Sequence, residues 1–107
     1  MRIVAVTACT VGVAHTYIAR DKLEAAAVRR GHEILIETQG NVGIEDELPP
    51  EAIQDADVVV LSADVAVARQ ERFAGKKVVR VPSVVAIKQA DQLIRKIEEK
   101  LGASNHG

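Results

Sequence analysis

The stretch RIVAVTACTVGVAHTYIARDKLEAAAVRRGHEILIET, residues 2–38, holds two apolar runs separated by one helical pattern. Residues 2–8 are apolar and β-branched, which is typical of a short buried strand, and residues 33–38 indicate a second strand. Between them, residues 12–30 are good helix formers and end before Gly31, where a helix C-terminal cap is expected. An apolar stripe at helical spacing predicts the inward face of this helix: Ala19, Leu23, Ala26 and Ala27. The stretch therefore predicts a strand–helix–strand unit.

The remaining sequence continues the alternation of predicted strands and helices. Residues 57–63 and 75–81 indicate two further strands, and the continuous apolar run of the first implies burial on both faces. Residues 39–50 are predicted to form a loop. Pro50 is placed to open a short helix through Ala56, and residues 70–73 indicate a short irregular or helical piece. The last helix carries an apolar stripe and ends at Gly102: Ala86, Ala90, Ile94, Ile97 and Leu101.

Alternating strands and helices with short loops favour parallel strands joined by right-handed crossovers. We therefore predict an α/β fold of three layers, in which a Rossmann-like, four-stranded parallel sheet has helices on both faces. The length of 107 residues fits one domain. We assign this domain to residues 1–102 and predict a flexible tail at residues 103–107.

Composition narrows the function classes. Apolar residues make up 48% of the chain and aromatic residues only 2%, so the core must consist of aliphatic side chains. The two aromatic residues, Tyr17 and Phe73, are interpreted as packing or partner contacts. A net charge of −1 with so few aromatics argues against nucleic-acid binding. No apolar run is long enough to span a membrane, the N-terminal MRIVAV is too short for a signal peptide, and one cysteine is compatible with a reducing cytosol.

Cys9, the single cysteine, follows the first predicted strand. In folds of this kind, ligands gather at the carboxyl ends of strands near the point where the strand order reverses. The ordinary role of a free cysteine is buried packing. However, the first N–H groups of the following helix lack helical partners and carry the positive end of its dipole, so they would favour a thiolate and hold a phosphate. We therefore interpret Cys9 as a nucleophile.

Spacing argues against several other uses of a cysteine loop. A low-molecular-weight tyrosine phosphatase needs an arginine six residues after its cysteine, where this chain has His15. A redox pair needs a second cysteine, and a flavodoxin needs aromatic residues around the flavin. A response-regulator receiver needs acidic residues at the end of the first strand, where this chain has Thr7, Ala8 and Cys9. The sequence has no GxxxxGK motif, and its histidines and cysteine lack zinc-ligand spacing.

The segment VAVTACTVGVAHTYIA, residues 4–19, resembles the active-site segment of the fructose-type enzyme IIB domains of the bacterial phosphoenolpyruvate-dependent sugar phosphotransferase system. That segment usually reads C-P-T-G-x-A-H-T. The resemblance continues in ETQGNVGIEDEL, residues 37–48, and in ERFAGKKV, residues 71–78. It thus spans nearly the whole chain with three separated motifs in register. It also implies a four-stranded parallel sheet with helices on both faces.

The resemblance implies a protein-phosphocysteine sugar phosphotransferase. Cys9 would accept a phosphoryl group from a phosphohistidine on a IIA protein or domain and pass it to a sugar, fructose, held in the membrane-embedded IIC transporter. The phosphate site would consist of the residues that follow the cysteine: Thr10, Val11, Gly12, Val13, Ala14, His15 and Thr16. The resemblance implies no cofactor and no metal. It also implies a cytoplasmic protein that meets the inner face of the membrane only through IIC.

Two residues depart from the family motif, because Thr10 and Val11 stand where Pro and Thr are usual. The loss of Pro loosens the loop, while Thr10 offers a hydroxyl one residue earlier. Two other functions stay open. One is a regulatory or protein-binding relative that uses Cys9 only as a sensor, and the other is a phosphatase.

Three further features have alternative interpretations. His15 is either a packing residue or part of the phosphate site, and its position four residues before Ala19 places it near the inward stripe. Residues 37–40 are a strand end and turn that would lie beside the cysteine loop. The acidic residues 45–47 are interpreted as a solvated loop rather than metal ligands, because three consecutive carboxylates cannot all face one ion.

Overall fold

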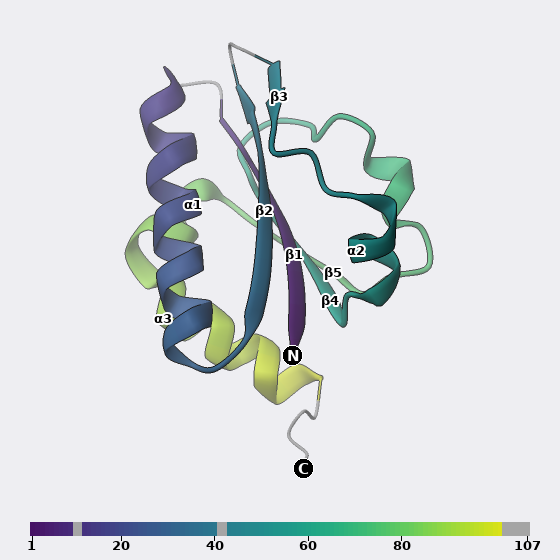
Figure 1. Ribbon diagram of the computed structural model, residues 1–107. Helices are drawn as coiled ribbons and strands as arrows, with labels where there is room; N and C mark the ends of the chain where they lie inside the picture. The colour runs from purple at the N-terminus through teal and green to yellow at the C-terminus, as the bar shows by residue number, and fades with distance from the viewer. Residues whose placement is uncertain (10–11, 41–42, 102–107) are drawn as a thin grey trace.

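The computed structural model describes residues 1–9, 12–40 and 43–101. Its strands and helices follow the predicted order along the chain, with one additional strand inside the predicted loop (Figure 1). They are β1 (Arg2–Ala8), α1 (Gly12–Arg29), β2 (Glu33–Gly40), β3 (Gly43–Glu45), α2 (Pro50–Asp55), β4 (Val58–Ala63), the 3-10 helix η1 (Gln70–Phe73), β5 (Val78–Val81) and α3 (Ser83–Lys100).

The sheet has five strands in the order β3-β2-β1-β4-β5. Strands β2, β1, β4 and β5 pair in parallel, as predicted, whereas β3 pairs with β2 in the antiparallel direction. The prediction of a four-stranded, all-parallel, Rossmann-like sheet is therefore wrong in its strand count and in the direction of one strand. The difference arises inside the predicted loop, because β2 continues to Gly40 and Gly43 pairs with it to begin the return strand. Gly43 has φ 97°, a backbone conformation that few other residues adopt without strain.

Helices cover both faces of the sheet, which gives the three predicted layers. Figure 1 shows α1 and α3 on one side of the sheet and α2 on the other. Because successive strand side chains point to opposite faces, Ile3 and Ala5 pack towards α1 and α3, whereas Val4 and Val6 pack with Ile53 of α2 and with η1. Both core clusters are aliphatic apart from the buried Phe73 of η1, so the prediction of a packing role for Phe73 is confirmed.

The C-terminal end of α1 is tied to α3 by ion pairs. Both Glu98 carboxylate oxygens of α3 accept hydrogen bonds from the Arg30 guanidinium at 2.8 and 2.9 Å, and His32 Nε2 lies 2.6 Å from Glu98 Oε2. Arg29 of α1 donates two hydrogen bonds to the Asp91 carboxylate of α3, at 2.7 and 2.8 Å. These contacts fix the two helices against each other on the same face of the sheet.

The strand order places a switch point at β1. From β1, the chain goes to β2 on one side and later returns to β4 on the other, so the carboxyl ends of β1 and β4 border the point where the order reverses. This edge of the sheet is where ligands are expected in an open α/β fold. Within the described residues, the helices are too short or too polar to cross a membrane.

Candidate functional site

Cys9 lies at the carboxyl end of β1, directly beside the end of β4. Only 9% of Cys9 is exposed, and its Sγ donates a hydrogen bond of 3.2 Å to Asp64 Oδ2. The sheet register explains this contact, because Ala8 pairs with Ala63, the residue before Asp64. The Asp64 N–H also donates to the Ala8 carbonyl at 3.0 Å, so the two strand ends are joined by backbone as well as by side chains.

The Asp64 carboxylate also holds the beginning of α3. Its Oδ1 accepts a hydrogen bond of 3.0 Å from the Ser83 N–H, and its Oδ2 accepts one of 2.5 Å from Ser83 Oγ. The residue before the helix is Pro82, whose side chain makes no capping hydrogen bond. Asp64 therefore takes the role of an N-terminal cap for α3 from a neighbouring strand end.

Asp64 is a charged group at neutral pH. The hydrogen bonds from Ser83 are the main cause that lowers the pKa of Asp64 below its usual value, and the Cys9 thiol and the charge of His15 act in the same direction. Burial opposes these effects only in part. The thiol therefore faces an ionised carboxylate. Asp64 is not among the residues predicted from the sequence, although it follows β4 in the same way that Cys9 follows β1, and the rule about ligands at strand ends points to it as well.

The predicted phosphate-binding residues fall into three groups. Thr10 and Val11 lie outside the described residues. Gly12 and Val13 begin α1, as predicted, so the helix starts three residues after Cys9. In the first turns of α1, Ala14 and His15 are exposed, whereas Thr16 is only 1% exposed.

His15 does not pack inward. The expectation that it lies near the inward stripe is wrong, since His15 is exposed and Thr16 takes the buried position on this turn. His15 is close enough to Asp64 for its charge to lower the pKa of that carboxyl. These two observations place His15 at the rim of the site formed by Cys9 and Asp64.

Three buried hydroxyl groups lie on the face of the sheet that carries the site. Thr7 and Ser62 are partners in the β1–β4 register, two residues before Cys9 and Asp64 respectively. Thr16 of α1 is also buried, and the structure gives none of these three hydroxyl oxygens a hydrogen-bond partner among the described residues. The site therefore rests on a polar layer rather than directly on the aliphatic core.

The end of β2 lies beside β1, but its charged side chain points away from the thiol. Gln39 pairs with Ala8, which confirms that this strand end neighbours the cysteine loop. Glu37 belongs to the opposite face, where it is fully buried and accepts hydrogen bonds of 2.7 and 2.9 Å from the Arg72 guanidinium. Burial raises the pKa of Glu37, but the hydrogen bonds from Arg72, from the Gln39 amide and from the Leu48 N–H outweigh it and lower the pKa below its usual value.

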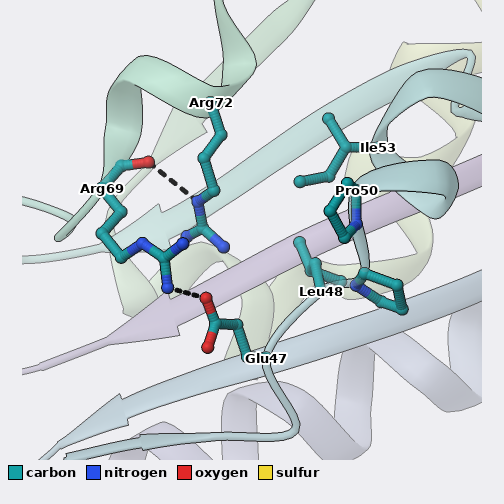
Figure 2. A pocket seen from close by; sticks show the side chains of 7 residues that line it. Glu47, Leu48, Pro50, Ile53, Arg69 and Arg72 are labelled. Carbon is teal, nitrogen blue, oxygen red and sulfur yellow. Dashed lines mark hydrogen bonds and ion pairs between the residues drawn. The ribbon is translucent and has the colours of Figure 1, made fainter.

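Arg72 also borders a surface pocket of about 530 Å³ on this opposite face (Figure 2). Its lining residues are Glu47, Leu48, Pro49, Pro50, Ile53, Arg69 and Arg72. Figure 2 shows Arg69 paired with the Glu47 carboxylate and Arg72 bonded to the Arg69 carbonyl. Cys9 is not among the lining residues, so this pocket is separate from the site.

The acidic residues 45–47 are exposed, as predicted, and two of them bind other side chains. Glu45 accepts hydrogen bonds from Tyr17 and Thr38, and Glu47 pairs with Arg69. In residues 1–9, 12–40 and 43–101, no three His, Cys, Asp or Glu side chains are grouped to hold a metal ion.

The chain is similar to proteins of one family. Residues 4–96 match the family described as "PTS system, Lactose/Cellobiose specific IIB subunit", where PTS denotes the phosphotransferase system. The chain is 50% identical over 100 residues to "PTS system fructose-like EIIB component 2" of Escherichia coli K12, covering 94% of each chain.

Two solved structures have the same fold. A domain of the fructose-specific IIABC component from Borrelia burgdorferi is 49% identical, with a TM-score of 0.84, and the match covers 88% of this chain and 89% of that one. The enzyme IIB subunit of the phosphotransferase system from Escherichia coli K12 is 37% identical, with a TM-score of 0.91, and the match covers 98% of this chain and 97% of that one. The chain therefore belongs to the IIB family of the phosphotransferase system, and within it to the fructose type.

Proposed function

We propose that Cys9 carries a phosphoryl group from a phosphohistidine on a IIA protein or domain to a sugar delivered with a membrane IIC transporter. The observation that carries the proposal is the position of this thiol in a chain of the IIB family. It lies at the carboxyl end of β1, where the strand order reverses, and three residues before α1. The relative from Borrelia burgdorferi, a domain of a IIABC component, supports partnership with IIA and IIC.

The chemistry of the step fits this position. Phosphoryl transfer needs alignment of the reacting groups and neutralisation of charge more than any other help from a protein. A cysteine sulfur is a good nucleophile near neutral pH, and it can form a covalent intermediate that a second acceptor resolves. The first N–H groups of α1 have no helical partners, so residues 12–15 would supply backbone donors to the phosphate oxygens.

The acceptor sugar and the cellular location of this chain are proposed from its relatives and from the role of IIC. The printed name of the Escherichia coli relative refers to fructose, and we propose fructose or a closely related hexose as the final acceptor. Since IIC holds the sugar, this chain would act in the cytoplasm at the inner face of the membrane. Burial of Cys9 argues against a role as a redox sensor, because sensor cysteines are solvent-accessible.

The test is phosphorylation by the upstream relay. We expect the wild-type chain to gain the mass of one phosphoryl group after incubation with a phosphorylated IIA protein, and Cys9→Ser to gain none while keeping its circular dichroism spectrum. Labelling of the Ser variant at the wild-type rate would disprove the assignment of Cys9. A chromogenic aryl phosphate tests the phosphatase alternative, and we expect no hydrolysis.

A further inference from the structure

The side chain that contacts the reacting sulfur is Asp64, a residue that the family resemblance does not assign to the site. Its Oδ2 lies 3.2 Å from Cys9 Sγ and accepts the thiol hydrogen. It comes from another strand, 55 positions further along the chain. A carboxylate in direct contact with a nucleophile is placed to act on that nucleophile's proton.

We propose that Asp64 is the catalytic base that takes the proton of Cys9 as the phosphoryl group arrives. This proposal rests on the proposed phosphocarrier function. As the Sγ–P bond forms, the Sγ–H bond breaks and its proton moves to Asp64 Oδ2. The N–P bond of the donor phosphohistidine breaks at the same time, and its electron pair stays on the imidazole nitrogen. Asp64 then releases the proton to water.

The contacts of Asp64 keep it ready for this role. Ser83 donates to both carboxylate oxygens, from its N–H to Oδ1 and from its Oγ to Oδ2, which fixes the direction of the carboxylate. Oδ2 is therefore shared between the Ser83 hydroxyl and the Cys9 thiol. These hydrogen bonds keep the carboxyl ionised and therefore able to accept a proton, but they also make it a weaker base, so the proton moves only as the Sγ–P bond forms.

Proton transfer to Asp64 also removes the electrostatic repulsion between its carboxylate and the incoming phosphoryl group. A phosphoryl group on Cys9 brings up to two negative charges close to the carboxylate. Like charges at this distance repel strongly in a partly buried site. If Asp64 is neutral when the phosphate forms, the transition state avoids this repulsion.

A purely structural role is the competing interpretation, since Asp64 caps α3. The variants Asp64→Asn and Asp64→Glu separate the two roles. Asn keeps the size of the side chain and an oxygen for the Ser83 N–H, but it cannot accept the thiol proton. Glu keeps the carboxylate but is longer, so it disturbs the contacts with Ser83 more. A structural role predicts that the Asn variant is the more active, and proton acceptance predicts the reverse.

Asp57→Asn is the matched control. Asp57 lies just before the opposite end of β4, is exposed and accepts a hydrogen bond of 2.8 Å from the Arg2 N–H. Its substitution removes the same charge and also a hydrogen bond from a backbone N–H, far along the strand from Cys9. The assay is single-turnover transfer from phosphorylated IIA to the intact chain, followed by mass spectrometry. In parallel, the rate at which iodoacetamide alkylates Cys9 at pH 7 measures the reactivity of the thiol in the absence of any partner protein.

We expect Asp64→Asn to slow phosphoryl transfer about 100-fold, within the range typical of general base catalysis. We expect the same variant to be alkylated faster than wild type, because the attacking thiolate no longer faces a carboxylate. Asp64→Glu should transfer faster than Asp64→Asn, and Asp57→Asn should match wild type in both assays. Because Cys9 is buried, a loss of folding would also speed alkylation. Rescue of transfer by Asp64→Glu, together with an unchanged circular dichroism spectrum of Asp64→Asn, therefore separates proton acceptance from a loss of folding.

Two results would overturn the inference separately from the proposed function. If wild type is phosphorylated and Asp64→Asn is phosphorylated equally fast, Asp64 is not the base. If Asp64→Asn is slow and Asp64→Glu is slower still, the role of Asp64 is to hold α3. If wild type takes no phosphoryl group at all, the phosphocarrier function itself fails, and the inference about its proton fails with it.

Discussion

Glu37 and Arg72 form a buried ion pair on the face of the sheet away from Cys9. Glu37 has no exposed surface, and the Arg72 side chain is 11% exposed. A buried carboxylate is tolerated only where it is paired and hydrogen-bonded, and here it accepts bonds from Arg72, Gln39 and the Leu48 N–H. The pair therefore joins β2, η1 and the segment before α2 on the face away from Cys9.

We expect Arg72→Met to lower the free energy of unfolding by about 3–5 kcal/mol, because it leaves the buried Glu37 carboxylate without its cation. The measurement is urea denaturation at pH 7. The matched control is Arg69→Met, which breaks the exposed pair with Glu47 and should cost no more than about 1 kcal/mol. Equal losses for the two variants would show that the buried pair contributes nothing beyond a surface pair.

Glu98 of α3 is the charged residue that joins α3 to the C-terminal end of α1, through Arg30 and His32. The hydrogen bonds from Arg30, followed by the contact with His32, lower the pKa of Glu98 from 4.5 to about 2. A carboxyl whose folded pKa is lowered contributes stability above its unfolded pKa. That contribution is lost as the pH falls through the folded value.

We expect Glu98→Gln to lower the free energy of unfolding by about 1–2 kcal/mol at pH 7, because it removes the charge from a partly exposed hydrogen-bonded group. The difference from wild type should shrink as the pH falls from about 5 towards 2, and it should vanish only below the folded pKa, where the Glu98 carboxyl is neutral like the Gln side chain. Denaturation curves at several pH values measure it, with the exposed Glu99→Gln as control. A difference that stays constant down to pH 2 would contradict the assignment.

The sequence predicts most elements because their signals are local. The apolar runs at residues 2–8 and 57–63, the stripe on α1 and Pro50 at the start of α2 each depend only on neighbouring residues, and the structure confirms these elements. Strand β3 was missed because Gly43–Glu45 contains one apolar residue and is exposed throughout, so no hydrophobic pattern distinguishes it from a loop. Its structure comes from pairing with β2, not from its own composition.

The sequence predicts Cys9 and the start of α1 as parts of the site, but not Asp64 and Ser83. Cys9 and the start of α1 adjoin one another in the chain, so the sequence brings them together directly. Asp64 reaches Cys9 through the β1–β4 register, and Ser83 reaches Asp64 through the β4–β5 register, in which Ser62 pairs with Val81. These contacts join distant positions, so they depend on the order of the strands, although the rule about strand ends does mark Asp64 as a candidate. His15 was placed wrongly because a shift of one residue decides which side of a helix turn is buried.

In residues 1–9, 12–40 and 43–101, neither aromatic side chain is placed to form a sugar site. Sugar sites usually combine aromatic platforms with converging polar groups. Here Phe73 is buried in the core, and Tyr17 is engaged by Arg20 and Glu45. The pocket in Figure 2 is largely apolar at one end, its two arginines are paired with acids, and it lies away from the thiol.

We therefore expect calorimetry to detect no binding of fructose or related hexoses at millimolar concentration. We also expect the phosphorylated chain to form no sugar phosphate unless IIC membranes are added. Since both partners must reach Cys9 over the same surface, IIA and IIC should compete for the chain through small, transient interfaces. Sugar phosphate formed without IIC would make this chain a self-contained kinase and contradict the phosphocarrier role.

The central position of β1 has a consequence for synthesis of the protein. Cys9 is translated 55 residues before Asp64, and Ser83 follows 19 residues after that. At roughly 5–20 residues per second, the first interval lasts about 3–11 s. During that time β1 has no β4 to pair with, and the thiol has no carboxylate beside it. A nascent chain therefore exposes the Cys9 thiol to oxidants for seconds before the contact with Asp64 can form.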